Sequence, residues 1–272
     1  MEREEKIRFA LMTLKPMALH TFSFICQILG TNDRRVGERF GSGFRYFLGG
    51  RKVLVSVAHV FSDGRSKFNE LAGSKGNGRM PELLALDVLR IDREADLAVN
   101  LAPSDDSVTD GSAYWPEDRI DRSLDRLSTD YLFVHGFPGL RSRPWAMPGD
   151  NRVMSRSLPY GVMQRIDNLP DDLHDYQFAM DFEAENIQTE DTVPEPGLFE
   201  QSIGPKGLSG SPVWRIGGSG RRAVDWVPDW CELVGIVTQW RPNAKLLVAT
   251  KITKLLDMAN VATESIDGVS SE

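Results

Sequence analysis

The sequence predicts an all-β protein built as a sandwich or barrel, and three observations support this prediction. Short runs of apolar residues recur along the chain, glycine and proline turns separate them, and convincing helical periodicity is confined to the two ends. The chain has 272 residues, 41% of them hydrophobic. That is enough for one large domain or two smaller ones, each with its own core.

The clearest hairpin signal is "FRYFLGGRKVLVSVAHV", which reads as two strands joined at Gly49-Gly50. In the second of these strands, alternation places Val53, Val55 and Val57 on one face. The remaining strand candidates are, in chain order, "LALDVLRID", "DLAVNLA", "YLFVHGFPG", "YQFAMDFEAEN", "SPVWRI", "ELVGIVTQW" and "KLLVATKI".

Helical patterns occur only near the termini. The start of the chain, up to about Leu19, reads as a helix, and "ITKLLDMANVA" reads as a short amphipathic helix near the end. The polar stretch 103–130 reads as a linker that divides the β-rich chain into two halves. The acidic run 183–195 is interpreted as a solvated loop, with a regulatory or partner-binding role as the alternative.

Composition restricts the partners and the compartment. The formal net charge is −7 and the chain has no Lys/Arg cluster, which argues against a general nucleic-acid binder. Cys26 and Cys231 form no CxxC motif, so a zinc site is disfavoured, and two buried free thiols are preferred over one disulfide. The acidic start is unlike a signal peptide, and no segment reads as a membrane span. These features predict a soluble, cytoplasmic protein without a membrane partner.

Ser209 lies between glycines in "PKGLSGSPVW", which fits either a turn or a nucleophile held beside converging backbone N–H groups. Serine hydrolysis also needs a histidine base and an orienting carboxylate. The chain has four histidines, and none follows Ser209, which excludes the order serine, acid, histidine. The remaining order on a β-scaffold is histidine, aspartate, serine, which His59, Asp96 and Ser209 satisfy.

Four motifs in this order resemble those of trypsin/chymotrypsin-like serine peptidases: "GSGF" from Gly41, "VSVAHV" with His59, "DLAV" with Asp96, and "GLSGSP" with Ser209. The strand "VGIVTQW" and the terminal helix are similar too, so the resemblance spans about 22–259. It implies two six-stranded antiparallel β-barrels and a C-terminal helix, with the active site between the barrels. The implied units are an N-terminal extension at 1–21, a first barrel at 22–125, a second barrel with the helix at 126–262, and a tail at 263–272.

The resemblance also implies roles for these residues. Ser209 would be the nucleophile, His59 the base, and Asp96 the group that orients His59. The N–H groups of Gly207 and Ser209 would form the oxyanion hole, and Thr238 would support the aspartate. No cofactor or metal is implied.

Other candidates for these roles are weaker. Asp92 is a rival for the aspartate, although it lies outside "DLAV". His135 is interpreted as a packed or capping histidine, and His20 and His174 have no motif around them.

Four positions bear on specificity and activation. Ser211 replaces a family glycine, and Leu208 replaces the aspartate that receives a new N-terminal amine in secreted members. Trp240 stands where many relatives have glycine, and Ile203 aligns with the floor of the substrate pocket. The resemblance thus predicts a pocket formed by Ile203, Thr238 and Trp240 that prefers a small or apolar residue before the cut bond.

Two functions from different classes follow. The first is a serine endopeptidase of narrow specificity, acting inside the cell on a protein or peptide substrate and restrained by a regulatory protein partner. The alternative is an inactive protease-fold module that binds a peptide by adding it to a sheet edge or serves as a scaffold.

Overall fold

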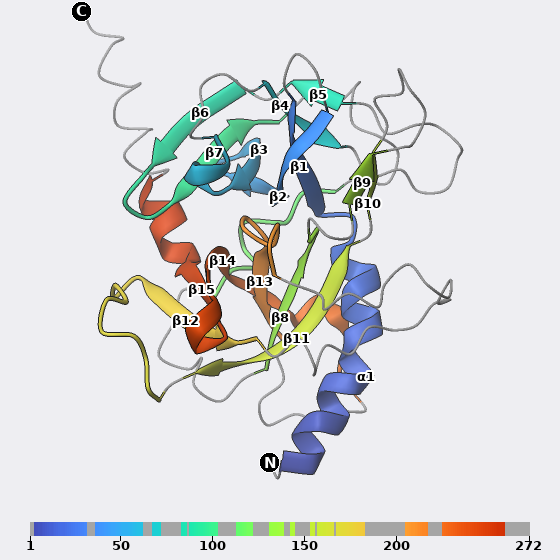
Figure 1. Cartoon of the computed structure of the whole chain (residues 1–272). Coiled ribbons are helices and arrows are strands. Elements are labelled where there is room, and N and C mark those ends of the chain that lie inside the picture. The colour runs from blue at the N-terminus through green and yellow to red at the C-terminus, as the bar shows by residue number, and fades with distance from the viewer. Residues whose placement is uncertain are drawn as a thin grey trace, which may run out of the picture.

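The structure is a computed structural model of the chain (Figure 1). It describes residues 3–31, 36–61, 67–71, 83–85, 87–102, 113–121, 131–138, 142–144, 153–155, 157–165, 167–182, 205–216 and 225–258. The predicted linker is described only at 113–121. The acidic run 183–195, the pocket residue Ile203 and the tail 263–272 lie outside the described residues.

The N-terminal half forms a seven-stranded sheet, in the order β5-β4-β1-β2-β3-β7-β6. All of its neighbouring strands are antiparallel. The strand bounds are β1 (Ile25–Thr31), β2 (Val36–Leu48), β3 (Arg51–Ser56), β4 (Lys67–Leu71), β5 (Leu83–Ala85), β6 (Asp87–Asp92) and β7 (Leu97–Leu101). The predicted hairpin is confirmed, because Gly49 and Gly50 connect β2 to β3 with positive φ angles of 57° and 74°.

The segment "LALDVLRID" is two strands instead of one. It divides into β5 and β6, which lie at opposite edges of the sheet. A single residue separates these strands, so their facing ends are at most about 7.6 Å apart. The sheet must therefore curl until its two edges approach each other, which gives the barrel-like shape expected for this half, with seven strands in place of six.

The C-terminal half is a closed six-stranded barrel, in the order β11-β12-β15-β14-β13-β8. Its strands are β8 (Tyr131–Gly136), β11 (Leu158–Arg165), β12 (Gln177–Asp181), β13 (Pro212–Arg215), β14 (Glu232–Arg241) and β15 (Leu246–Lys251). A separate two-stranded ribbon joins β9 (Ser142–Pro144) to β10 (Val153–Ser155). Together the two halves confirm the predicted all-β, two-barrel fold class. The domain boundaries drawn from the sequence stay predictions.

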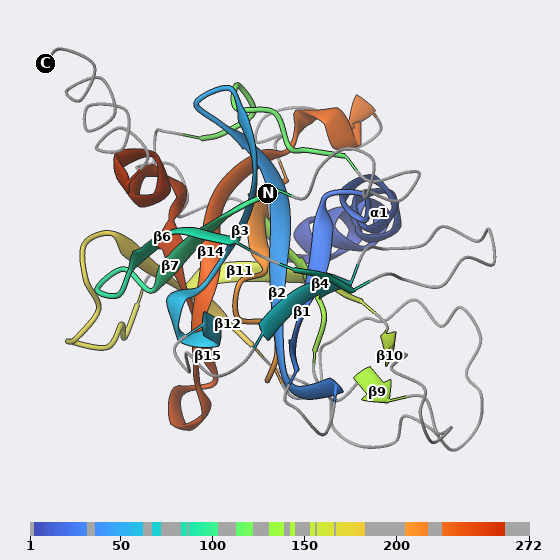
Figure 2. The ribbon, with the colours of Figure 1, turned by 90° about the horizontal axis from the view of Figure 1, so that it is seen from above.

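Among the described residues, helices occur only near the two ends of the sequence, apart from short 3₁₀ turns. Helix α1 (Arg3–Thr21) contacts β8 and β11, and residues 252–258 form the helix expected after the last strand. Viewed from above, α1 lies on one side of the strands and the C-terminal helix on the other (Figure 2). In the part of the chain that the structure describes, no helix is both long and apolar enough to cross a bilayer.

Helix α1 is part of the core although Pro16 lies inside it. Leu14 and Met17 are buried in the larger hydrophobic cluster. Packing against the barrel therefore offsets the helix hydrogen bond that a proline removes. The predicted N-terminal extension at 1–21 thus contributes core residues.

Met17→Ala is expected to lower the free energy of unfolding by about 2–5 kcal/mol, because the Met17 side chain is fully buried and its loss leaves a cavity. Met12→Ala is the matched control, since Met12 lies on the same helix with 48% of its surface exposed. It is expected to change stability by no more than about 0.5 kcal/mol. Urea denaturation of both variants measures the difference, and equal losses would show that α1 does not pack as described.

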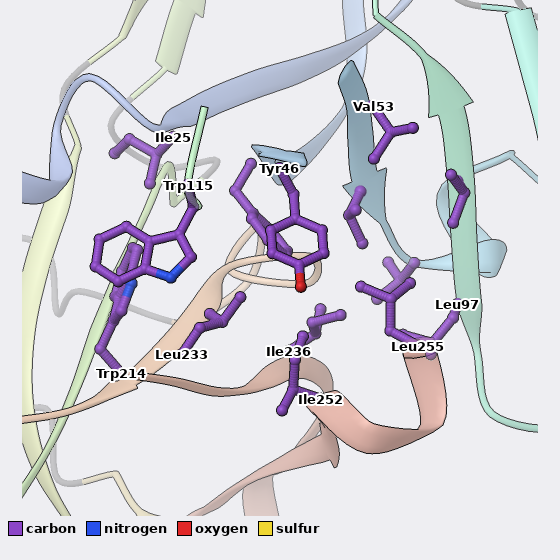
Figure 3. Close-up of a cluster of buried hydrophobic side chains, with 14 of the residues drawn as sticks. Ile25, Tyr46, Val53, Leu97, Trp115, Trp214, Leu233, Ile236, Ile252 and Leu255 are labelled. Carbon is purple, nitrogen blue, oxygen red and sulfur yellow. The ribbon is translucent and has the colours of Figure 1, made fainter. Parts of the chain in front are cut away.

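A short segment within the predicted linker joins the two halves. Trp115 forms a parallel bridge with Tyr46 of β2, and Ile120 forms one with Leu233 of β14. Trp115 is completely buried and meets Trp214 of the barrel edge-on, with 5.9 Å between ring centroids (Figure 3). Composition alone suggested a polar connection here, but these apolar contacts make the segment part of the interface.

One hydrophobic cluster extends across both halves. Figure 3 shows side chains of β1, β2, β3 and β7 facing those of β13, β14 and the C-terminal helix. A second cluster fills the C-terminal barrel and includes Leu208. Cys26 and Cys231 are buried and form no disulfide with each other, as predicted, and burial raises the pKa of Cys231 to about 12. That thiol is therefore neutral at ordinary pH.

Candidate active site

His59 and Asp96 form a hydrogen-bonded pair in the first half. His59 lies on the 3₁₀ turn Ala58–Phe61 just after β3, and Asp96 directly precedes β7. Asp96 Oδ2 is 2.7 Å from His59 Nδ1, and Asp96 Oδ1 accepts the His59 backbone N–H at 2.9 Å. A carboxylate only accepts hydrogen bonds, so the proton of a neutral ring lies on Nδ1. Nε2 is then left as the basic nitrogen.

The turn before β7 fixes the position of Asp96. Asp96 adopts a left-handed backbone conformation with φ of 53°, which is uncommon outside glycine. Asp92 Oδ1 accepts the N–H groups of Glu94 and Ala95, and Thr250 Oγ1 donates to the Ala95 carbonyl. The rival aspartate, Asp92, therefore shapes the turn that presents Asp96.

Ser209 lies in a tight loop before β13. Gly207 and Gly210 flank it with φ angles of 99° and 88°, values that favour glycine. The N–H groups of Leu208, Gly210 and Ser211 donate to the carbonyls of Pro205, Val237 and Leu208. Within the described chain, the backbone bonds of this loop leave the N–H groups of Gly207 and Ser209 as candidate oxyanion donors.

These loops meet at a cleft of about 410 Å³ between the two halves. The residues that line it are His59, Asp96, Gln177, Ser209, Thr238, Gln239 and Trp240. The structure therefore brings together the three residues predicted for catalysis and two of the three predicted for the pocket, Thr238 and Trp240.

Thr238 makes a different contact from the one that the resemblance implies. Its hydroxyl donates to the Val248 carbonyl at 3.3 Å, so it holds neighbouring strands together instead of supporting Asp96. Trp240 packs edge-on against Phe182, with ring centroids 5.2 Å apart. This contact braces a large ring at the cleft.

Sequence reasoning did not find Gln177 and Gln239. Gln177 Oε1 accepts the backbone N–H of His174, and Gln239 Oε1 accepts from Arg241 Nε. Arg241 also donates to both carboxylate oxygens of Asp172, and this hydrogen bonding lowers the pKa of Asp172. Gln177 lies in no motif, so only the fold reveals its place at the cleft. Gln239 lies between Thr238 and Trp240 in "VGIVTQW", and that position was a signal that could have found it.

The other histidines lie outside the residues that line this cleft. His20 packs edge-on against Phe24 and Trp115, and His174 stacks on Tyr176.

His135 is a buried structural residue, consistent with its interpretation as a packed histidine. The Thr21 hydroxyl donates to the Met17 carbonyl, so its oxygen accepts from His135 Nδ1 at 2.7 Å. Ser157 Oγ lies 2.9 Å from Nε2 and donates to it. The histidine thereby joins the end of α1 to the C-terminal barrel.

His135 is expected to make stability depend on pH. Burial lowers its pKa from 6.5 to about 3. Between these values the unfolded chain binds a proton that the folded chain does not, so stability falls as pH falls, by up to about 1.4 kcal/mol per pH unit. Urea denaturation from pH 7 to 4 should show a shallower slope for His135→Gln than for His174→Gln, which alters an exposed histidine. Equal slopes would contradict this assignment.

Comparison with known proteins supports the fold. No protein-family model matches the sequence, and a search of curated proteins finds no match. Among solved structures, the thermostable serine protease AL20 from an extremophilic microorganism matches with 12% identity and a TM-score of 0.50, over 88% of this chain and 96% of that one. An inactive mutant form of Rv3671c from M. tuberculosis H37Rv matches with 14% identity and a TM-score of 0.49, over 97% and 95% of the two chains.

The fold assignment rests on the first of these two structures and on the strand order described above. At 12% identity the likeness concerns architecture alone. The chain therefore has the trypsin/chymotrypsin-like double β-barrel fold.

Proposed function

We propose that the protein is a serine endopeptidase that cleaves peptide bonds through an acyl-enzyme intermediate. The observation that carries this proposal is the His59–Asp96 hydrogen bond in the same cleft as Ser209. These are the three groups that nucleophilic hydrolysis needs, on the fold in which they are expected.

In the proposed mechanism, Ser209 Oγ attacks the scissile carbonyl carbon while His59 Nε2 takes the hydroxyl proton. The C–N bond then breaks, and His59 returns the proton to the departing amine, which leaves an ester on Ser209. Water attacks that ester with the same base, and the acid product departs. Asp96 keeps the proton on Nδ1 and stabilises the charged ring.

The N–H groups of Gly207 and Ser209 are proposed to stabilise the oxyanion in both steps. One donor of this kind contributes about 3–4 kcal/mol to lowering the barrier in comparable enzymes.

Specificity is proposed to be narrow, for a small or apolar residue before the cut bond. Trp240 supports this, because its ring packs against Phe182 and limits the room at the cleft. A cytoplasmic location and restraint by a regulatory protein partner belong to the same proposal. A peptide-library cleavage profile dominated by arginine or lysine would contradict the specificity.

A fluorophosphonate probe tests the proposed function directly. Folded wild-type protein is expected to gain one adduct, which peptide mapping by mass spectrometry places on Ser209. Ser209→Ala should abolish labelling, whereas Ser211→Ala, a buried serine two residues away, should retain it. Folded wild-type protein that gains no adduct, even with cell lysate added, would favour the alternative: an inactive module that binds peptides or acts as a scaffold.

A further inference from the structure

Ser42 of β2 holds the nucleophile loop from the opposite half of the molecule. Its backbone N–H donates to the Ser209 carbonyl at 2.8 Å, and its hydroxyl donates to the Gly207 carbonyl at 2.9 Å. The same hydroxyl accepts the Phe137 N–H at 2.8 Å, and the Ser42 carbonyl accepts from Ser56 Oγ at 2.7 Å. Ser42 is fully buried, so all four bonds lie away from water.

The hydrogen bond from the Ser42 hydroxyl matters because it restrains Gly207. Gly207 has a φ of 99° and no side chain, so its own conformational preferences leave many orientations open. Leu208, the next residue, is fully buried in the apolar cluster of the C-terminal barrel and offers no carboxylate. An ammonium ion brought there would be buried beside a leucine, which is costly without a partner. The orientation of the loop must therefore come from other contacts.

We propose that Ser42 is a positioning residue that preorganises the oxyanion hole by anchoring the Gly207 carbonyl across the interface between the two halves. This inference rests on the proposed function. It assigns to strand β2 the ordering of the oxyanion hole, a role that the resemblance gives to a new N-terminal amine in secreted members. The Gly207 carbonyl shares its peptide plane with the Leu208 N–H, which donates to the Pro205 carbonyl. The Ser42 bond therefore helps to hold the turn 205–208, which carries the Gly207 N–H, before any substrate arrives. A donor that is already aligned adds no reorganisation cost during the reaction.

The two halves of the molecule pack closely together around Ser42. A Cβ added at Gly210 would lie 1.9 Å from the Ser42 carbonyl oxygen, and one added at Gly136 would lie 2.7 Å from Ser42 Oγ. The two halves thus approach at backbone distance at this point. The Ser42 hydroxyl of the first half can therefore hold the nucleophile loop of the second half in a fixed position.

Ser42→Ala tests the proposal against Ser211→Ala. Both changes remove one buried serine hydroxyl near the loop, but Ser211 Oγ has no hydrogen-bond partner among the described residues. Ser42→Ala is expected to lower the fluorophosphonate labelling rate by about 10- to 100-fold, somewhat less than the loss of a whole oxyanion donor. Its pH–rate midpoint should not move, because the His59–Asp96 pair is unchanged. Ser211→Ala should label at the wild-type rate.

Ser42→Thr keeps the hydroxyl and is expected to restore most of the rate, which a purely structural effect on stability would not predict. Thermal unfolding of each variant separates loss of rate from loss of fold. A wild-type rate in folded Ser42→Ala, or an equal loss in Ser211→Ala, would overturn the proposal.

A second measurement does not depend on activity. Amide hydrogen exchange over residues 205–211 should be at least about tenfold faster in Ser42→Ala than in Ser211→Ala, because the lost bond lets the loop open. If wild-type protein is not labelled, the proposed function fails, and exchange alone then decides whether Ser42 anchors the loop. Unchanged exchange in Ser42→Ala would overturn the anchoring role whatever the activity.

Discussion

Asp96→Asn is expected to reduce the fluorophosphonate labelling rate by about 10⁴-fold while the protein stays folded. An asparagine can turn its amide N–H₂ toward His59 Nδ1, which then becomes an acceptor and moves the ring proton to Nε2. A protonated Nε2 cannot take the proton of Ser209. The rate is measured by following adduct formation with intact-protein mass spectrometry, and thermal unfolding reports the fold.

Asp92→Asn is the matched control for this change. Asp92 belongs to the same turn and accepts two backbone N–H groups through Oδ1, which an asparagine oxygen can also do. Its labelling rate should stay close to the wild-type rate. A large loss in Asp92→Asn with a small one in Asp96→Asn would exchange the roles of the two aspartates and contradict the site described above.

Gly210→Ala is expected to prevent folding or to cost more than about 3 kcal/mol of stability. The new Cβ would lie 1.9 Å from the Ser42 carbonyl oxygen and 2.4 Å from Ser56 Oγ, at a backbone φ of 88°. Both neighbours are held in the interface between the halves, so neither can move away cheaply.

Alanine substitutions at two other glycines distinguish the steric clash from the backbone strain as causes of this loss of stability. Gly50→Ala has a positive φ but no atom within 4 Å of its added Cβ, so it should cost only the conformational strain of about 1–2 kcal/mol. Gly161→Ala has open space and no positive φ, so it should be nearly neutral. Urea denaturation of the three variants gives the ranking, and a Gly210→Ala loss no larger than that of Gly50→Ala would contradict the close approach.

The strands predicted from the sequence are those with uninterrupted apolar patterns, such as β3 and β14. β11 was missed because Pro159 and Gly161 interrupt its pattern, and β1 was missed because it follows directly on the end of α1. The buried position of Trp115 could not be predicted, since one tryptophan within a polar stretch gives no periodic signal. Long-range packing decides each of these cases.

Some residues of the candidate site could also be predicted from the sequence, and others could not. His59, Asp96 and Ser209 were recognisable because each lies in a short motif, and the chain order of the motifs is informative. The Ser42 hydroxyl donates to a carbonyl 165 positions away in the sequence, and Gln177 reaches the cleft from a segment without a motif. Such positions become visible only when the two halves are placed together.

The C-terminal helix has a consequence for how the chain folds during synthesis. Ile252 and Leu255 pack in the same cluster as Val53 and Leu97 of the first sheet (Figure 3). The cluster joins residues that are 155 to 202 positions apart, and a ribosome makes this helix after the strands of both halves. The N-terminal sheet therefore emerges with part of its apolar surface uncovered until residues 252–255 have been made. Until then it is a surface that chaperones can bind, and a nascent chain stalled before residue 252 should remain sensitive to proteases along its first half.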